Sequence, residues 1–287
     1  MLFGAHLSVS GGYDATVEYA QHVGAECMQV FAKSPRQWHG KPIDPDAAAR
    51  FAELRAESGF GPLFTHTAYL LNLASDDPVL WHRSVGALAD EMTRGRLLQA
   101  SGVVLHVGAD RTDDPAAAAD RVARGIREAF ALCDCTHPET RLLLENTAGA
   151  GHTFGGSFEE MGWVLDLLGK ERVLVGVCLD TCHAHAYGHD LATPLAWDAL
   201  LAEIEQACGS GALGLIHAND CMFERGSHRD RHAWIGEGTL GEAAFDAMVC
   251  APAAHSMCVV TEMPGEVPEK DVVNIERLKA LRTRCDA

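Results

Sequence analysis

The sequence predicts an α/β fold of the TIM (β/α)8 barrel type, in which parallel strands close into a barrel covered by helices. Short apolar runs alternate with longer helical patterns along the whole chain, and there are eight such runs. The length of 287 residues, with 47% hydrophobic content, fits one barrel of about 250 residues. We therefore expect a single TIM-barrel domain over residues 1–287, with its active site at the C-terminal face of the strands.

The eight apolar runs are rich in β-branched and aliphatic residues, as strands of a parallel sheet covered on both faces are. They span residues 2–8, 26–32, 62–68, 102–108, 141–147, 173–181, 213–220 and 257–264. Between them, residues 44–58, 113–133 and 193–208 have helical composition, and each of these stretches opens with Asp or Thr next to Pro.

A doubly wound open sheet shows the same alternation of strands and helices. It would normally carry a glycine-rich nucleotide turn after its first strand. Gly11 and Gly12 follow the first run, but the GxGxxG spacing is absent. The barrel is therefore the favoured fold.

Composition limits the possible environments and partners. No run approaches the roughly 18 apolar residues of a membrane span, and the first residues lack the features of a secretory signal. Ten cysteines are thinly spread, several of them in apolar runs, so we expect free buried thiols and a cytoplasmic protein. A net charge of −17 argues against a general nucleic-acid binder, because such proteins usually carry a basic footprint.

Polar residues follow the downstream ends of the runs, where a barrel gathers its active site. The nine candidates are His66, His106, Glu145, Asp180, His183, His217, Asp230, His232 and Glu262. A lone histidine at a strand end is more often a hydrogen-bonded structural residue. Several buried carboxylates and imidazoles together need cations or large pKa shifts, and this mixture of ligands suits Zn²⁺ or Mn²⁺ in an open catalytic site.

Ordered motifs give the chain a resemblance to the bacterial endonuclease IV family over nearly its whole length. These motifs are GAHLSVSGG, KSPRQW, HTAYLLNL, ENTAGAG, LDTCHAHAYGHD, HANDC, DRHAWIGEG and TEMP. One departure is HVGAD after His106, where members of the family tend to have a proline after the histidine.

The resemblance implies three Zn²⁺ ions per chain, with Mn²⁺ or Fe²⁺ possible at one or more sites. It implies that His66 and His106 hold the first ion and that Glu145 bridges to a second. Asp180, His217 and Glu262 would complete the second ion's ligands, and the third would take His183, Asp230 and His232.

The activity implied is that of a deoxyribonuclease IV, which cuts the phosphodiester bond 5′ to an abasic site in double-stranded DNA. The products would be a 3′-hydroxyl and a 5′-deoxyribose phosphate, with Glu145 and Glu262 as catalytic residues. Four ligand carboxylates bring −4 and three divalent ions bring +6, so about +2 remains in the cleft. An acidic protein, which we expect to be monomeric, can therefore still bind a phosphate there.

Recognition of the lesion is assigned to two loops. By resemblance, Arg36 and Tyr69 would insert into the duplex at the abasic nucleotide, which costs less to extrude than a normal one. Further basic residues in loops on the metal face could contact phosphates. They are Lys33, Arg225, Arg229 and Arg231.

Two alternatives and several residues stay open. A metal-dependent sugar isomerase or epimerase would use the same barrel with one or two ions, and a damage-binding module would hold zinc structurally. No role is assigned to His152, His185, His189 and His228. We expect Cys178 and Cys182 to be buried thiols.

Overall fold

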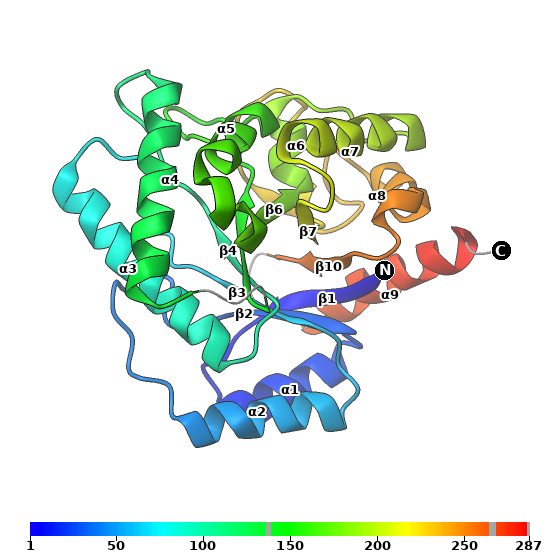
Figure 1. The fold of residues 1–287 in the computed structure, drawn as a ribbon. Coiled ribbons are helices and arrows are strands. Elements are labelled where there is room, and N and C mark those ends of the chain that lie inside the picture. Colours follow the sequence, from blue (N-terminus) through cyan, green and yellow to red (C-terminus); the bar gives the residue numbers. More distant parts are fainter. Residues whose placement is uncertain (136–138, 264–267, 286–287) are drawn as a thin grey trace.

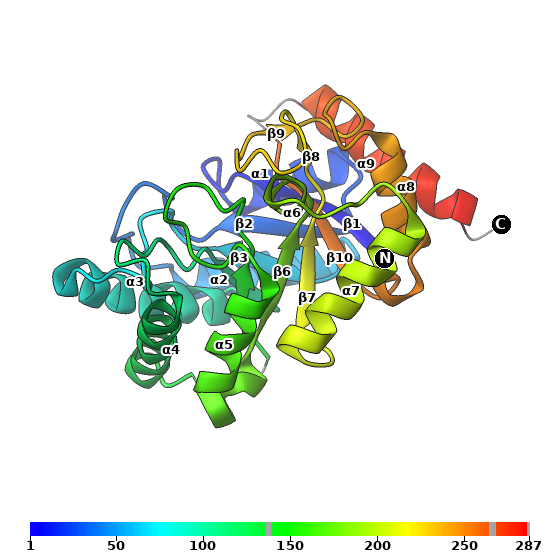
Figure 2. The same cartoon turned by 90° about the horizontal axis from the view of Figure 1, so that it is seen from above.

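The computed structural model describes residues 1–135, 139–263 and 268–285 and confirms the predicted TIM barrel (Figure 1). Eight parallel strands form a closed barrel in the order β1-β10-β7-β6-β5-β4-β3-β2. Helices lie outside the barrel between successive strands, as in Figure 2, where the molecule is seen from above. Among the described residues, none of the helices combines the length and the hydropathy that a membrane span requires.

Each predicted apolar run contains one barrel strand. The strands are β1 (Leu2–Leu7), β2 (Cys27–Phe31), β3 (Leu63–His66), β4 (Gly102–Leu105), β5 (Arg141–Glu145), β6 (Val175–Asp180), β7 (Leu213–His217) and β10 (Cys258–Thr261). The strands are shorter than the runs, because the run ends turn into loops that carry polar side chains. The last run reaches Pro264, which lies outside the described residues.

The described residues form nine α-helices, most of which begin at a capping side chain. They are α1 (Tyr13–His22), α2 (Pro45–Glu57), α3 (Pro78–Leu97), α4 (Pro115–Leu132), α5 (Phe158–Leu168), α6 (Thr181–Tyr187), α7 (Pro194–Cys208), α8 (Glu242–Cys250) and α9 (Pro268–Cys285). Asp44, Asp114 and Thr193 each accept a hydrogen bond from a backbone N–H in the first turn, with Pro next in sequence.

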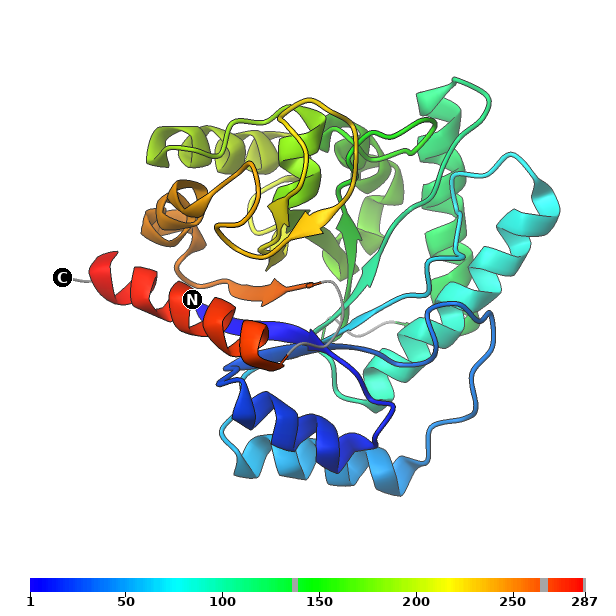
Figure 3. The same cartoon turned by 180° about the vertical axis from the view of Figure 1, so that it is seen from behind.

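The two ends of the described chain meet beside β1. Figure 3 shows α9 lying along β1, and Arg282 donates to the carbonyl of Met1 at 2.7 Å and to Glu26 Oε2 at 2.9 Å. Cys285, at the end of α9, is joined to Cys250 of α8 by a disulfide with a Cα–Cα distance of 5.5 Å. The expectation of free thiols is therefore wrong for this pair, whereas the other eight cysteines are free and buried.

A small antiparallel hairpin that the sequence did not predict follows β7. It pairs β8 (Asp220–Cys221) with β9 (His232–Ala233), and the SHRDRHAW segment runs from its loop through β9. Asp220 holds the chain that follows β9 against β8, because its carboxylate accepts hydrogen bonds from Gly236 and Gly238 N–H at 2.9 and 3.0 Å. The hairpin thus folds the segment back over the ends of the barrel strands (Figure 2).

Candidate metal centre

The barrel interior changes from apolar to polar over two residues of each strand. One buried cluster, here called the apolar layer, contains Cys27, Phe64, Val104, Leu143, Cys178, Leu215 and Val260. Two positions further along the same strands stand Gln29, His66, His106, Glu145, Asp180, His217 and Glu262, and His6 of β1 joins them to form the polar layer. Side chains of a strand repeat every two residues, so both layers face the barrel interior.

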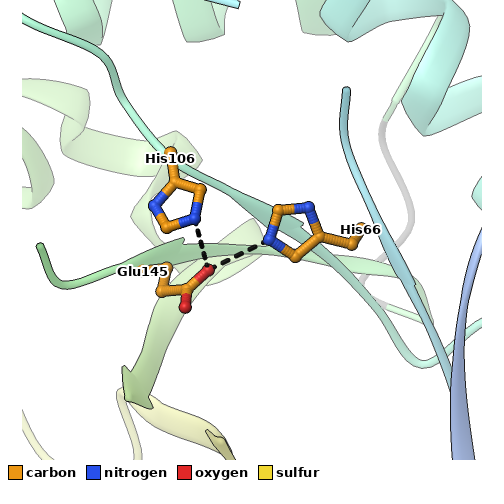
Figure 4. Close-up of side chains that lie close together, drawn as sticks. All are labelled: His66, His106 and Glu145. Carbon is orange, nitrogen blue, oxygen red and sulfur yellow. Dashed lines mark hydrogen bonds and ion pairs between the residues drawn. The ribbon is translucent and has the colours of Figure 1, made fainter. Parts of the chain in front are cut away.

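His66, His106 and Glu145 form the first group of potential metal ligands, with donor atoms within 4.8 Å of one another. Both imidazoles point at the same carboxylate oxygen (Figure 4). The distance to Glu145 Oε2 is 3.1 Å from His66 Nε2 and 3.2 Å from His106 Nε2. These residues come from the ends of β3, β4 and β5, which are neighbours in the barrel.

Glu145, Asp180, His217 and Glu262 form a second such group. His217 Nδ1 lies 3.0 Å from Glu145 Oε1 and 3.2 Å from Glu262 Oε2. Glu145 therefore faces the first group with one oxygen and the second group with the other. A carboxylate in that position can bridge two cations.

The third group consists of His183, Asp230 and His232. His183 lies in the first turn of α6, because Asp180 ends β6 and caps the helix by accepting from His183 N–H at 2.8 Å. Asp230 comes from the hairpin loop, and its oxygens lie 3.2 Å from His183 Nε2 and 3.4 Å from His232 Nε2. The structure thus brings all nine candidates together in three groups.

Three of the five candidate histidines are oriented as metal-binding imidazoles usually are, with one ring nitrogen held by a backbone carbonyl and the other facing the cluster. The Nδ1 atoms of His66, His183 and His232 lie 2.8–2.9 Å from the carbonyls of Thr67, Asn146 and Glu262. His232 Nε2 is buried without a hydrogen-bond partner. The donor set therefore fits divalent cations of the Zn²⁺ class.

Electrostatics in the cluster also favour a positive charge. Burial alone would raise the pKa of Glu145, but the neighbouring His106 and His217 hold it well below its usual range. Burial opposes ionisation of Asp230 as well, but His183 lowers its pKa to about 2. Burial alone would lower the pKa of His183, and the carboxylates of Asp180 and Asp230 raise it to about 10. His106 has less compensation, and its burial lowers its pKa to about 4.

Sequence reasoning missed four polar residues that hold the ligands. Gln29 Oε1 lies 2.9 Å from His217 Nε2, and His6 Nδ1 lies 2.9 Å from Glu262 Oε1. Asn219 donates to Asp180 Oδ2 at 2.6 Å, and Asn146 donates to the Asp180 carbonyl at 3.2 Å. A signal for two of them was available: His6 and Gln29 are polar residues inside apolar runs, in register with the later ligands.

The six predicted DNA-contact residues lie in loops at this end of the barrel but differ in exposure, and the exposed Arg225 forms an ion pair with Asp190 at 3.1 Å. Tyr69 is 62% exposed, and Arg36, Arg229 and Arg231 are exposed as well. Lys33 is buried and forms an ion pair with Glu91 of α3. A cavity of about 760 Å³ opens beside the candidate metal ligands, and its walls include Tyr69, Arg231, His232 and Glu262.

The remaining histidines and cysteines mostly support loops. His228 Nδ1 lies 3.0 Å from the Ala148 carbonyl, and His185 Nε2 lies 3.1 Å from Thr239 Oγ1. His152 lies near Asp113 and His189 near Glu203, at 3.4 and 3.7 Å. Cys178 and Cys182 are buried free thiols, as predicted. Cys178 belongs to the apolar layer, and the thiol of Cys182 lies within 4.8 Å of the donor atoms of Asp180 and His232.

Fold and site together define a TIM barrel with a cluster of candidate metal-ligand residues at the C-terminal ends of its strands. Residues 17–283 match the family described as xylose isomerase-like TIM barrel. Sugar epimerases share this fold: a D-tagatose 3-epimerase-like protein is 16% identical with a TM-score of 0.76, over 100% of this chain and 98% of its own.

The chain is more similar to endonucleases with this fold than to the epimerase-like protein. The probable endonuclease 4 of Methanoculleus marisnigri is 38% identical over 98% of this chain and 99% of its own length, and that of Oleidesulfovibrio alaskensis is 39% identical over 98% and 95%. The crystal structure of endonuclease IV from Thermus thermophilus has a TM-score of 0.87 and 34% identity, covering 99% of this chain and 100% of its own. The chain belongs to the endonuclease IV family and is a nuclease.

Proposed function

We propose that this nuclease is a zinc-dependent apurinic/apyrimidinic endonuclease that hydrolyses the phosphodiester bond 5′ to an abasic site. The products are a 3′-hydroxyl and a 5′-deoxyribose phosphate. The observation that carries the proposal is the threefold grouping of nine donor residues in a member of the endonuclease IV family. Three groups allow three Zn²⁺ ions, with Mn²⁺ or Fe²⁺ as substitutes.

When bound, the ions supply an activated water and stabilise negative charge on the phosphate and on the leaving oxygen. The protein contributes the geometry. Glu145 holds the first two groups at a fixed separation, because its two oxygens face His66 and His217 at 3.1 and 3.0 Å. Glu262 joins the second group to the hairpin loop, since its carbonyl lies 2.8 Å from His232 Nδ1. These contacts support catalytic roles for Glu145 and Glu262.

Binding of DNA by a chain with a net charge of −17 requires a local reversal of the field. Three divalent ions on four carboxylates leave about +2 at the mouth. Arg231 of the hairpin loop adds positive charge at the cavity wall, and the exposed Arg229 lies two residues earlier in the same loop. Phosphate contacts are therefore concentrated where the cluster lies.

Lesion recognition is assigned to Arg36 and Tyr69. Tyr69 is the exposed aromatic residue at the cavity wall, and its N–H donates to the Pro35 carbonyl at 3.2 Å, so the two side chains stand on loops that touch. An abasic nucleotide has no base to stack, and these side chains would occupy the space it leaves. We further propose a cytoplasmic monomer in which residues 1–287 form one domain.

A sugar isomerase or epimerase on the same barrel has no use for the group formed by His183, Asp230 and His232. The likeness to solved epimerases, at 16% identity, extends to the fold alone. The number of bound ions therefore separates the two functions.

The test combines elemental analysis of the purified protein with an incision assay. We expect three metal ions per chain and one nick, 5′ to a single abasic analogue in a duplex, with an undamaged duplex of the same sequence left intact. Arg36→Ala should weaken binding to the abasic duplex by about tenfold while the metal content stays the same. One or two ions per chain without incision would overturn the proposal.

A further inference from the structure

A buried ion pair lies behind the loop that carries Arg36. The loop spans residues 33–41, here called the lesion loop, and its first residue, Lys33, pairs with Glu91 of α3. Both side chains are nearly inaccessible, at 2% and 1% exposure. Lys33 Nζ also lies 3.6 Å from the partly exposed Asp90.

Glu91 connects the lesion loop to the loop that carries Tyr69. The carboxylate oxygen that receives Lys33 also accepts a hydrogen bond from Ala68 N–H at 3.1 Å. Ala68 is the residue before Tyr69, whose own N–H donates to the Pro35 carbonyl at 3.2 Å. A single oxygen of Glu91 thus fixes the start of one loop relative to the other.

The same face of α3 also holds the far end of the lesion loop. Arg83 lies over the ring of Trp38, 4.2 Å from its centroid. Arg94 donates to the carbonyls of Gly40 and Lys41 at 3.1 and 2.9 Å. The loop is therefore attached to α3 at both ends, and Arg36 stands on the exposed stretch between these attachments.

Close packing leaves this arrangement little freedom. A Cβ atom at Gly40 would lie 2.7 Å from Lys33 Cβ, so the two ends of the loop are pressed together. The second oxygen of Glu91 is buried without a hydrogen-bond partner. A buried ion pair is weak as a source of stability, because desolvation offsets most of its attraction, but it can specify one geometry.

We propose that Glu91 is a positioning residue for lesion recognition: it fixes the loops of Arg36 and Tyr69 relative to each other, so that both side chains meet the extruded abasic nucleotide together. This inference rests on the proposed function. Glu91 itself lies behind the loops and belongs neither to the three ligand groups nor to the cavity wall.

Glu91→Gln is the informative variant. Glutamine keeps an acceptor for Ala68 N–H but loses the charge that binds Lys33, which Asp90 still partly compensates. We expect kcat/KM on a duplex with one abasic analogue to fall by about tenfold to a hundredfold, mostly through KM, because misplaced binding groups are costly. Cleavage of bis(p-nitrophenyl) phosphate, which needs no extrusion, should stay within about twofold of wild type, as should the metal content.

Three comparisons exclude a merely structural effect. Glu26→Gln removes a carboxylate paired with Arg282 and Lys279, away from the metal face, and should leave abasic-site kinetics unchanged. In a Tyr69→Ala background, Glu91→Gln should have little additional effect, because the two changes act on one step. If Glu91→Gln does not fold, Arg83→Ala, an exposed change that frees Trp38, should raise KM in the same direction.

Wild-type kinetics in Glu91→Gln, or full additivity with Tyr69→Ala, would overturn the inference. A wild-type protein that does not nick the abasic duplex would instead overturn the proposed function. In that case, amide hydrogen exchange tests the positioning role without an activity assay. Exchange within residues 33–41 should be faster in Glu91→Gln than in Glu26→Gln. Equal exchange in the two variants would contradict it.

Discussion

The apolar layer and the polar layer inside the barrel come from the same strands but contain opposite kinds of side chain. The apolar layer contains aliphatic, aromatic and thiol side chains that need no partner. The polar layer, two residues further along, contains imidazoles, carboxylates and an amide, most of them buried, that contact one another. A shift of two residues along a strand keeps the side chain on the same face, so the difference lies in the residue types alone.

The difference shows which part of the barrel serves folding and which serves chemistry. Leu143 fills the space above two glycines, because a Cβ atom at Gly102 or Gly214 would lie 2.8 Å from its methyl groups. Such interlocking stabilises the fold. Glu145, two residues later, is fully buried among His66, His106 and His217 and would cost free energy without a cation. The proposed metal site accounts for a polar layer at this depth.

The largest expected effect comes from removing the bridging charge. Glu145→Gln keeps the shape of the side chain but loses the charge shared by the first two groups, so at least one ion should be lost. We expect abasic-site incision to fall by about 1,000-fold or more, with circular dichroism unchanged. Incision at the wild-type rate, with all ions still bound, would show that this carboxylate has no special place in the polar layer.

Leu143→Ala is the matched change in the apolar layer of the same strand. The cavity it leaves above Gly102 and Gly214 should lower the free energy of unfolding by about 2–5 kcal/mol, measured by urea denaturation. At a temperature where the variant stays folded, its incision rate and metal content should match those of wild type. A Leu143→Ala variant as stable as wild type, or one that loses its metal before it unfolds, would contradict the distinction between the layers.

Most of the fold was predictable because each strand is an apolar run and several helices have explicit caps. Asp44, Asp114 and Thr193 each carry the cap that was expected. The β8–β9 hairpin could not be predicted, because each strand has two residues and depends on Asp220 for its return. The Cys250–Cys285 disulfide depends on the packing of α9 against α8, a long-range contact without a local signal.

For the site, the sequence predicted which candidate ligands lie close together, but not which residues hold them in position. Strand ends can be read from the pattern, so the nine candidates follow from the sequence alone. The supporting residues Asn146 and Asn219 act through hydrogen bonds across neighbouring strands, which spacing does not encode. Lys33 shows the same limit: a basic loop residue was expected to face DNA, and it is buried against Glu91, a contact made by a helix distant in sequence.

Gln29→Leu tests the supporting members of the polar layer. Gln29 lies 2.9 Å from His217 Nε2 and donates to Glu262 Oε1 at 2.7 Å, so leucine removes the partner of His217 Nε2 and one of the partners of Glu262, which keeps His6. Metal affinity should fall by about tenfold to a hundredfold, as is common when outer partners of ligands are removed. Competition with a zinc-binding dye measures this, and Gln21→Leu on the exposed face of α1 is the control. Unchanged affinity would assign Gln29 to packing alone.

The smallest expected effect concerns a carboxylate near the mouth but outside both layers. Asp110 is buried; burial works against its ionisation, but hydrogen bonds from Thr112 and Asp114 and the charge of Arg121 lower its pKa below the usual 3.8. A depressed carboxyl pKa contributes stability that is present above the unfolded value and is lost as pH falls through the folded value. Asp110→Asn should therefore reduce the free energy of unfolding by about 1 kcal/mol at pH 7, and the difference in free energy from wild type should close below about pH 4.

The control is Asp120→Asn, which breaks an exposed ion pair with Arg124 on α4 and should leave the free energy of unfolding unchanged. A gap that persists in acid would mean that Asp110 acts through packing, whereas a loss of incision would place it in the site with Glu145.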